Sequence, residues 1–444
     1  MHARLSILQL SAADEGGGAE DVAARLAAAY ARSGHRSVLA VGRRRSGDGA
    51  VVEVPNAGAS RTAWSRHWRA RADELKERRR YHRARVARAL ADPRTVADLL
   101  AGREDMRHPG SHVLLDRLAL RPSIVQAHNL HGGWFDLRAL PAVAAAAPLV
   151  LTLHDSWLFT GHCAHPLDGE RWLTGCGSCP RLDLYPALHR DGTAANWRRK
   201  QEVFRRVAAH AAAPSRWLLE RAERSLLGPA LRERRVIPNG VDLGFFSPGD
   251  AATARTRLGL PPGARVVLFA ARGITRSHWR DWPTLRAALS ALGERNGPPL
   301  VFLGAGEERE TEQLGNCELR FVGDLGQGEL ADAYRAADVY VHAAHVDTFP
   351  GAVLEALASG LPVVATAVGG IPEQVRVDGP ERTGLLVPRQ APAELAAALS
   401  TLLEDEPMRR ALGAAARRDA EARFDERRQA RAYLDWFQEL AAAS

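Results

Sequence analysis

The chain of 444 residues has few cysteines and no long apolar run. Four cysteines are too few to form a disulfide framework in a chain of this length, which suits a reducing compartment. The most apolar stretch, 142–153, contains Pro148 and falls well short of the roughly 20 residues of a membrane-spanning helix. The apolar N-terminal stretch is too short, and too soon followed by acidic residues, for a signal peptide. We therefore expect a globular, cytoplasmic protein.

Acidic and basic residues are balanced except in one segment. The formal net charge is +8. The segment 61–88 holds 11 basic and three acidic residues, and this excess of positive charge equals that of the whole chain. The segment also contains the aromatic residues Trp64, Trp68 and Tyr81. We predict a basic helical insertion over about 58–110. It could lie on the inner membrane surface as a peripheral contact or hold a phosphorylated acceptor, or it could be a solvated helical insertion without a partner.

The first part of the chain alternates strand and helix patterns. An apolar strand at 5–10 is followed by the turn Gly16-Gly17-Gly18, a helical pattern at 19–31 and a strand at 37–41. Such a βαβ opening belongs to parallel sheets, which bind ligands at the carboxyl ends of their strands. Further strands are predicted at 123–127 and 148–153 and a helix at 196–209, in a first domain that spans 1–235.

The pattern starts again after a linker at 236–252, which contains Pro238, Asn239 and Gly240. A second domain is predicted over 253–424, and a helix at 425–444 whose aromatic residues pack back on the body. The fold class is therefore α/β with two Rossmann-like domains. The second domain is expected to contain strands at 265–271, 300–303, 319–322, 339–343, 362–366 and 384–387, and helices at 282–292, 328–336 and 351–359.

Four separated motifs occur in a characteristic order: GGAE at 17–20, VIPNGVD at 236–242, DTFPGAVLEALASGLPVVAT at 347–366 and GGIPE at 369–373. With them the chain resembles the retaining glycosyltransferases of family 4, in the subgroup typified by colanic-acid-type exopolysaccharide enzymes. The resemblance implies a GT-B fold, in which two Rossmann-like domains face each other across a cleft. It also implies transfer of a sugar from a UDP- or GDP-sugar to a hydroxyl acceptor, such as a polysaccharide, a lipid-linked sugar or a metabolite.

The resemblance assigns the donor site to the segment from Asp347 to Glu355. Glu355 would accept hydrogen bonds from the ribose hydroxyls, and Asp347 would bind hydroxyls of the donor sugar. A lone glutamate would otherwise be interpreted as an exposed helix carboxylate. Between them, backbone N–H groups at a helix start would bind the diphosphate. This segment consists of Thr348, Phe349, Pro350, Gly351, Ala352 and Val353, of which all but Pro350 carry a backbone N–H.

Basic side chains are expected to neutralise the leaving diphosphate. The chain contains no Asp-x-Asp pair, so we expect metal-independent catalysis without a cofactor. Members of the family place an arginine after the first strand of the second domain and a lysine several residues later. Arg272 matches the arginine, and Arg276 or Arg280 replaces the lysine, with Arg280 at the better spacing.

The nucleobase would lie near Gly304 and near Asp324 and Leu325, although the glycines of these segments could equally be plain turns. On the acceptor side, the resemblance places Gly17 and Gly18 where backbone and ligand approach closely. The cleft histidine of the family corresponds to His128 or His131, of which the other would only pack.

The dipeptide His154-Asp155 follows the next strand. Asp155 is interpreted as an acceptor-binding or positioning residue, because a front-face mechanism is the usual proposal for retention in this family. The alternative is that His154 and Asp155 only orient each other.

Three of the cysteines, Cys163, Cys176 and Cys179, have the spacing C-x12-C-x2-C. A close pair with a distant third thiolate is typical of structural zinc, and His162 or His165 could supply the fourth ligand. The subgroup has a fourth cysteine where this chain has Gly169. The alternative is that these thiols merely pack.

Two other functions fit parts of the sequence. A sugar-nucleotide 2-epimerase of GT-B fold would account for the fold but not for the acidic pair in its family context. A catalytically inactive module that binds membranes or nucleic acid would make the basic insertion the main feature. We expect no nucleic acid partner.

Overall fold

The computed structural model describes residues 3–60, 62–78, 80–118 and 120–443. Its contacts divide the chain into two compact units. Unit 1 consists of Met1–Ala213, Leu218–Ile237 and Ala430–Ser444, and unit 2 consists of Pro214–Trp217 and Pro238–Gln429. In the part of the chain that is described, no helix is both long enough and apolar enough to cross a membrane.

Unit 1 is built on a parallel sheet of seven strands in the order β3-β2-β1-β4-β5-β6-β7. The central strands are buried on both faces, as their Val, Ile, Leu and Ala content requires. The order reverses direction at β1, so polar residues that follow β1 and β4 meet at one edge. The strands are β1 (Ser6–Ala13), β2 (Arg36–Arg43), β3 (Val51–Glu53), β4 (Ile124–Ala127), β5 (Leu149–Thr152), β6 (Ala209–Ala213) and β7 (Leu231–Val236).

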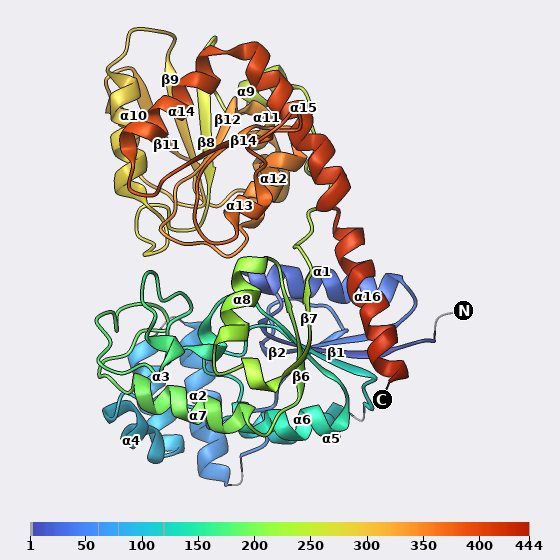
Figure 1. The fold of residues 1–444 in the computed structure, drawn as a ribbon. Coiled ribbons are helices and arrows are strands. Elements are labelled where there is room, and N and C mark those ends of the chain that lie inside the picture. Colours follow the sequence, from blue (N-terminus) through green and yellow to red (C-terminus); the bar gives the residue numbers. More distant parts are fainter. Residues whose placement is uncertain (1–2, 61, 79, 119, 444) are drawn as a thin grey trace. The chain divides into compact units, whose positions relative to one another are not determined.

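Helices cover both faces of this sheet (Figure 1). Tyr30 of α1 packs against Phe437 of α16 with ring centroids 5.8 Å apart, above apolar residues of β1, β4, β5 and β6. The C-terminal helix therefore completes the core of unit 1. The helices are α1 (Gly18–Arg32), α2 (Ala63–Glu77), α3 (Tyr81–Ala91), α4 (Arg94–Leu100), α5 (Leu114–Leu118), α6 (Leu140–Ala146), α7 (Thr193–Phe204), α8 (Arg216–Arg224) and α16 (Glu426–Ala442).

Unit 2 has a second seven-stranded sheet in the order β10-β11-β9-β8-β12-β13-β14. All of its strands are parallel except β10, which is antiparallel to β11. The predicted fold class, α/β with two Rossmann-like domains, is confirmed. The strands are β8 (Arg265–Ala270), β9 (Leu300–Ala305), β10 (Glu312–Leu314), β11 (Cys317–Phe321), β12 (Val339–His342), β13 (Val363–Thr366) and β14 (Gly384–Val387).

The helices of unit 2 follow the strands in the usual alternation (Figure 1). Asp281 caps the first turn of α10, where its side chain accepts from the N–H of Thr284 at 3.3 Å. The helices are α9 (Ala251–Arg257), α10 (Trp282–Gly293), α11 (Gln327–Ala336), α12 (Gly351–Ala358), α13 (Ile371–Gln374), α14 (Pro392–Glu404) and α15 (Glu406–Arg423).

Two sequence expectations about local structure were wrong. The helix predicted at 196–209 ends at Phe204, and β6 begins at Ala209. The sequence of β6, AHAAA, has no β-branched residue, and its burial in the sheet outweighs that composition. The basic segment 61–88 is also not one helix but the pair α2 and α3, and Arg61 and Arg79 lie outside the described residues.

Candidate functional site

A buried cluster of polar side chains lies at the carboxyl end of β12 in unit 2. Asp347, in the loop after this strand, forms an ion pair with Arg280, and its Oδ2 atom is 3.3 Å from Nε2 of His342. The hydroxyl of Tyr340 lies 3.1 Å from Nδ1 of His342. Burial disfavours charge on Asp347, but Arg280 and His342 outweigh burial and hold the pKa of this carboxyl well below its usual range. Asp347 is therefore an ionised carboxylate with a fixed orientation.

Backbone hydrogen bonds tie together the two loops that carry this ion pair. The N–H of Asp281 donates to the carbonyl of Ala343 at 3.1 Å, and the N–H of His345 donates to the carbonyl of Trp279 at 2.8 Å. The imidazole of His342 is fully buried, and burial lowers its pKa. A neutral ring with its proton on Nε2 can donate to Asp347 and accept from Tyr340. The strand β12 and the loop before α10 therefore both hold the cluster in place.

Glu355 lies in the second turn of α12, beside the start of that helix. The hydroxyl of Tyr334 donates to its Oε2 atom at 2.8 Å. Its Oε1 atom lies 4.0 Å from the place that a β-carbon on Gly351 would occupy. The carboxylate is therefore oriented by Tyr334 and turned toward the start of α12. There it can accept hydrogen bonds from hydroxyl groups of a ligand.

The loop that carries Arg272 and Arg276 is anchored by Glu307. This glutamate, with a side chain only 1% exposed, accepts from the N–H of Thr275 at 2.8 Å and from the hydroxyl of the same residue. Arg276 is 79% exposed and lies 3.6 Å from Glu307. Arg276 is therefore open to a ligand, whereas Arg280 is engaged by Asp347. The sequence favoured Arg280 over Arg276 as the cation that replaces the lysine, and the structure holds Arg280 in a different contact.

Some residues between Asp347 and Glu355 are buried in the core, and others lie at the surface. Phe349 packs edge-on against Phe424 with ring centroids 5.9 Å apart, and Val353 is fully buried. Gly351 is exposed, Ala352 is half-buried, and Pro350 precedes the helix. Thr348 is buried, and its hydroxyl has no hydrogen-bond partner among the described residues. Phe349 can therefore offer a ligand only its backbone, and the N–H of Val353 donates to the carbonyl of Pro350 at 3.2 Å.

The residues expected around the nucleobase lie after β9 and β11. Gly304 is inside β9, where a β-carbon would meet the ring of Phe321 at 2.8 Å. Asp324 is exposed and Leu325 is partly buried. The close packing of the strands explains why residue 304 is a glycine. A role of Gly304 in binding the nucleobase therefore stays a prediction.

In unit 1, His128 belongs to a buried hydrogen-bonded group at the ends of β1, β4 and β5. Its Nε2 atom lies 3.0 Å from the side-chain oxygen of Gln9, and its Nδ1 atom lies 2.9 Å from Nε2 of His154. Burial holds the pKa of His128 well below its usual range and lowers that of His154 to about 4. Both rings are neutral near pH 7 and pack inside the unit.

His131 differs from His128 because it pairs with a carboxylate. Its Nε2 atom is 2.9 Å from Oδ2 of Asp155, and its Nδ1 atom is 3.5 Å from the hydroxyl of Tyr185. Burial opposes protonation, but Asp155 and Glu20 outweigh it and raise the pKa of His131. Of the two candidate histidines, His131 is therefore the one suited to carry charge at the carboxyl edge of the sheet.

A cavity of about 380 Å³ opens beside the loop of His131. Residues after β1 and β2 line it together with the insertion, and its cationic side chains are Arg43, Arg45, Lys76 and Arg88. Burial, and then the charge of Arg88, lower the pKa of Lys76. Lys76 makes no hydrogen bond or ion pair with another described residue, so its ammonium group is open to a ligand. Acidic residues also line the cavity, namely Glu15, Glu20, Glu53 and Asp73.

Gly17 and Gly18 border the same edge at the start of α1. A β-carbon at Gly17 would meet the carboxylate of Glu20 at 2.3 Å, whereas nothing lies within 4 Å at Gly18. The carboxylate of Glu20 is the end of a flexible side chain that can move aside, so packing alone requires neither glycine, and Gly18 leaves open space beside the helix start.

The cysteine segment contains packed thiols. Burial raises the pKa of Cys163 to about 12 and that of Cys176 to about 11. The Nε2 atom of His162 lies 3.7 Å from the sulfur of Cys179. Among the described residues, no group of three or more His, Cys, Asp or Glu side chains is placed to hold a metal ion. Nothing in this arrangement favours the predicted zinc site over packing, and no step of the chemistry below uses a metal here.

Two family profiles match the chain. The profile described as Glycosyltransferase Family 4 matches residues 16–245, and the profile described as Glycosyl transferases group 1 matches residues 251–419. Together they cover both units.

Several relatives are named as D-inositol 3-phosphate glycosyltransferases. A D-inositol 3-phosphate glycosyltransferase of Kineococcus radiotolerans is 37% identical over 42% of this chain and 47% of its own length. A D-inositol 3-phosphate glycosyltransferase 1 of Catenulispora acidiphila is 31% identical over 73% of this chain and 71% of its own length. The chain spans about half the length of several such relatives. The expected subgroup was wrong in this respect, since these relatives are not colanic-acid-type enzymes.

Solved structures show the same two-domain fold. Sucrose-phosphate synthase from Thermosynechococcus elongatus superposes with a TM-score of 0.63 at 19% identity, over 99% of this chain and 100% of that one. Anabaena HepE in complex with UDP and glucose gives 0.62 at 18% identity, over 98% and 100%. The fold is therefore GT-B.

Proposed function

This chain belongs to glycosyltransferase family 4, and we propose that it moves a sugar, with retention of configuration, from a nucleoside-diphosphate sugar to a hydroxyl group. The observation that carries the proposal is the ordered carboxylate pair of unit 2. Asp347 is fixed by Arg280 and His342, and Glu355 is fixed by Tyr334, both at the carboxyl edge of a parallel sheet. Such an edge is where α/β sheets bind nucleotides.

On the donor side, we assign Glu355 to the ribose and Asp347 to the hydroxyls of the sugar. The diphosphate would lie against the first N–H groups of α12, with Arg272 and Arg276 as its cations. Arg276 is suited to this role because it is exposed and only loosely paired. Arg280 then acts mainly by holding Asp347, although its second N–H group remains available to a phosphate oxygen.

On the acceptor side, we propose a phosphorylated polyol, as the name of the relatives suggests for those proteins. The cavity of unit 1 supports this assignment because the partly buried Lys76 makes no hydrogen bond or ion pair there with another described residue, and Arg88 and Arg43 are close enough to lower its pKa. An anionic group of the acceptor would give the ammonium group of Lys76 a direct partner. A neutral acceptor would leave Lys76 without a hydrogen-bond partner.

The transfer itself would follow a front-face course. The acceptor hydroxyl attacks the anomeric carbon on the side from which the nucleoside diphosphate leaves, and a diphosphate oxygen takes the hydroxyl proton. The two arginines of the loop before α10 stabilise the charge that develops on the leaving group. His131, charged through Asp155, would bind the sugar or acceptor hydroxyls and would not need to remove a proton.

The test combines a donor panel with an acceptor panel. UDP-, GDP- and ADP-sugars are incubated with the protein, with and without inositol 3-phosphate or free inositol, and released nucleotide is measured. We expect one donor to be selected, with faster release when the phosphorylated acceptor is present. Glu355→Ala should abolish the release, whereas Glu310→Gln, at an exposed glutamate of the same unit, should leave it unchanged.

Three outcomes would contradict the proposal. If no donor binds at millimolar concentration, the enzyme assignment fails. Conversion of the nucleotide sugar without an acceptor would identify a 2-epimerase. Salt-sensitive binding of polynucleotides without affinity for any nucleotide sugar would identify an inactive binding module.

A further inference from the structure

Exposed apolar side chains are concentrated on the helical insertion of unit 1. Among the described residues, eight large hydrophobic side chains are exposed, and six of them lie between residues 64 and 100. The most exposed are Trp64, Val86 and Leu100, at 60%, 61% and 65%. The other three are Leu90, Val96 and Leu99. Scattered exposed apolar residues need no explanation, but six within one short insertion indicate an interaction surface.

These residues lie close together in the fold. The indole N–H of Trp64, in the first turn of α2, donates to the carbonyl of Leu90 at the end of α3, at 2.8 Å. Val86 lies one turn before Leu90 on the same helix, and α4 follows directly after Asp92 and Pro93. On α4, the three exposed apolar residues are spaced by three or four positions and so share one side.

Exposed arginines accompany the apolar residues. Arg66, Arg80 and Arg83 are exposed, and none of them forms an ion pair with any residue that the structure describes. Arg83 is three residues before Val86 on α3 and therefore lies on the same helix face. Together with the six apolar residues, these three arginines define a surface that we call the docking surface.

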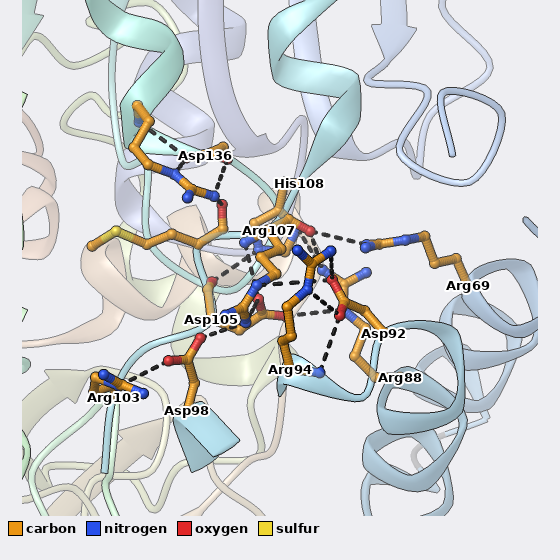
Figure 2. Close-up of polar contacts among 12 residues, drawn as sticks. Arg69, Arg88, Asp92, Arg94, Asp98, Arg103, Asp105, Arg107, His108 and Asp136 are labelled. Carbon is orange, nitrogen blue, oxygen red and sulfur yellow. Dashed lines mark hydrogen bonds and ion pairs between the residues drawn. The ribbon is translucent and has the colours of Figure 1, made fainter. Parts of the chain in front are cut away.

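The inner side of the same helices is neutralised within the protein. Figure 2 shows Arg69 of α2 and Arg88 of α3 directed toward the segment 105–108, where both donate to the carbonyl of Arg107, at 3.0 and 2.9 Å. Arg88 also pairs with Asp105 at 3.0 Å. Four aspartates complete this network, namely Asp92, Asp98, Asp105 and Asp136.

The arginines of this segment therefore fall into two groups, one directed into the unit and one directed toward solvent. Arg69 and Arg88 hold α2 and α3 on the unit, and of the three outer arginines Arg66 also donates to a backbone carbonyl, that of Ser60, at 3.1 Å. The excess positive charge of the segment therefore lies on the solvent-exposed side, next to exposed Trp, Val and Leu side chains. A second copy of the chain would bring like charges together on this surface, which disfavours self-association.

From this arrangement we propose that the docking surface binds the anionic surface of a lipid bilayer. Arginines attract acidic headgroups, a tryptophan suits the interface between headgroups and acyl chains, and the leucines and valines enter its apolar boundary. The insertion then lies flat on the membrane and does not cross it. This inference does not depend on the proposed function, because it concerns α2 to α4 alone.

The test is flotation of the full chain with lipid vesicles. Vesicles of phosphatidylcholine alone are compared with vesicles that also contain phosphatidylglycerol, at low and high salt. We expect binding only to the anionic vesicles, weakened by salt. Arg66→Gln, Arg80→Gln and Arg83→Gln together should lower the partition coefficient about 100-fold, at roughly fivefold for each charge. Trp64→Ser, Val86→Ser and Leu100→Ser together should lower it at least about tenfold.

Matched controls are available elsewhere in the chain. Arg427→Gln, Arg428→Gln and Arg431→Gln remove three exposed arginines of α16, and Val377→Ser replaces an exposed apolar residue of unit 2. Both controls should float like the wild type. Nucleotide release in vesicle-free buffer should be unchanged in all four variants. The apolar and arginine variants lose the hydrogen bonds of Trp64 to Leu90 and of Arg66 to Ser60, so their Tm should fall, but thermal unfolding should show that each is still folded at the temperature of the flotation assay.

Several results would overturn the inference. These are equal partition of the wild type to neutral and anionic vesicles, absence of flotation, or an equal loss in the α16 control. A dimer in solution that becomes a monomer in the apolar variant would identify a second copy as the partner. Flotation together with no nucleotide release from any donor would contradict the proposed function and leave the membrane contact standing.

Discussion

Arg280 and Asp347 form an ion pair in unit 2 whose side chains are only 19% and 17% exposed. His342 approaches both of them, at 3.2 Å from Arg280 and 3.3 Å from Asp347. The short side chain of Asp347 is thus reached by the long side chain of Arg280, from 67 positions away in the sequence. The ion pair and His342 therefore hold both side chains in place.

Replacing Arg280 by lysine should therefore impair the donor site. A lysine is a point charge that cannot contact Asp347 and a phosphate oxygen through separate N–H groups. We expect kcat/KM to fall roughly 10- to 100-fold, as for a lost charged contact of about 1.5 to 3 kcal/mol. Steady-state kinetics with the selected donor measure the effect. Arg286→Lys, at an arginine that is 44% exposed and paired with Glu312, serves as the control, and equal activity of the two variants would contradict this role.

Gly369 packs directly against the backbone of Asp347 and so constrains the loop that carries this residue. Its φ is +59°, and a β-carbon there would lie 1.8 Å from the carbonyl oxygen of Asp347. Gly369→Ala should destabilise the protein by about 2 kcal/mol or more and weaken donor binding, because the loop must move. Gly328→Ala, in α11 where nothing lies within 4 Å, should be neutral or stabilising. Urea denaturation of both variants is the measurement, and a stable Gly369→Ala protein with normal donor binding would argue against the assigned loop geometry.

Asp155 should control the pH dependence of catalysis through His131. Its charge raises the pKa of this imidazole against the effect of burial. In Asp155→Asn that support is lost, so the titration of His131 should move to lower pH. The alkaline limb of kcat/KM, where the charged form is lost, should move in the same direction. NMR titration and pH-rate profiles follow both shifts, with Asp116→Asn at an exposed position as the control. An unchanged limb would mean that His131 plays no charged role.

Buried neutral histidines should make the protein sensitive to acid. Burial lowers the pKa of His154 to about 4 and that of His108 to about 3, against about 6.5 in an unfolded chain. Between about pH 6.5 and 4 the unfolded chain therefore binds more protons, and the free energy of unfolding falls as the pH is lowered. His131 opposes this trend, because its raised pKa gives stability that is present at low pH and lost as the pH rises.

His154→Gln should reduce this slope by about 1.4 kcal/mol per pH unit, the value for one titrating group. Urea denaturation at several pH values in this window gives the slope. His82→Gln, at an exposed ring, should leave it unchanged. If the two variants have the same slope, His154 is not held neutral in the folded protein.

Much of the local structure around the proposed donor site was predictable from the sequence. The motif from Asp347 to Glu355 fixes a strand end, a helix start and the spacing of the two acids, and all three follow from local sequence. Arg280 could be named as a candidate but its partner could not, because its contact with Asp347 joins residues 67 positions apart. His342 was missed, although a histidine at the end of the apolar strand VYVH is a usable signal.

The acceptor half depended on tertiary contacts that the sequence does not reveal. His128 and His131 are equivalent in sequence, and only burial beside Gln9 or pairing with Asp155 distinguishes them. Lys76 was one of many cations in a basic segment, and the fold alone places it in the cavity. Strand β6 was missed because its alanines favour a helix until the sheet buries them.

Equilibrium binding of nucleotide sugars tests the central claim most directly. The wild type, Glu355→Ala and Glu310→Gln are titrated with UDP- and GDP-sugars and the heat of binding is recorded. We expect one nucleotide class to bind the wild type and Glu310→Gln with equal affinity, and Glu355→Ala to lose about 1.5 to 3 kcal/mol, or roughly 10- to 100-fold. Equal affinity of all three proteins, or no binding by the wild type at millimolar concentration, would contradict the donor site described here.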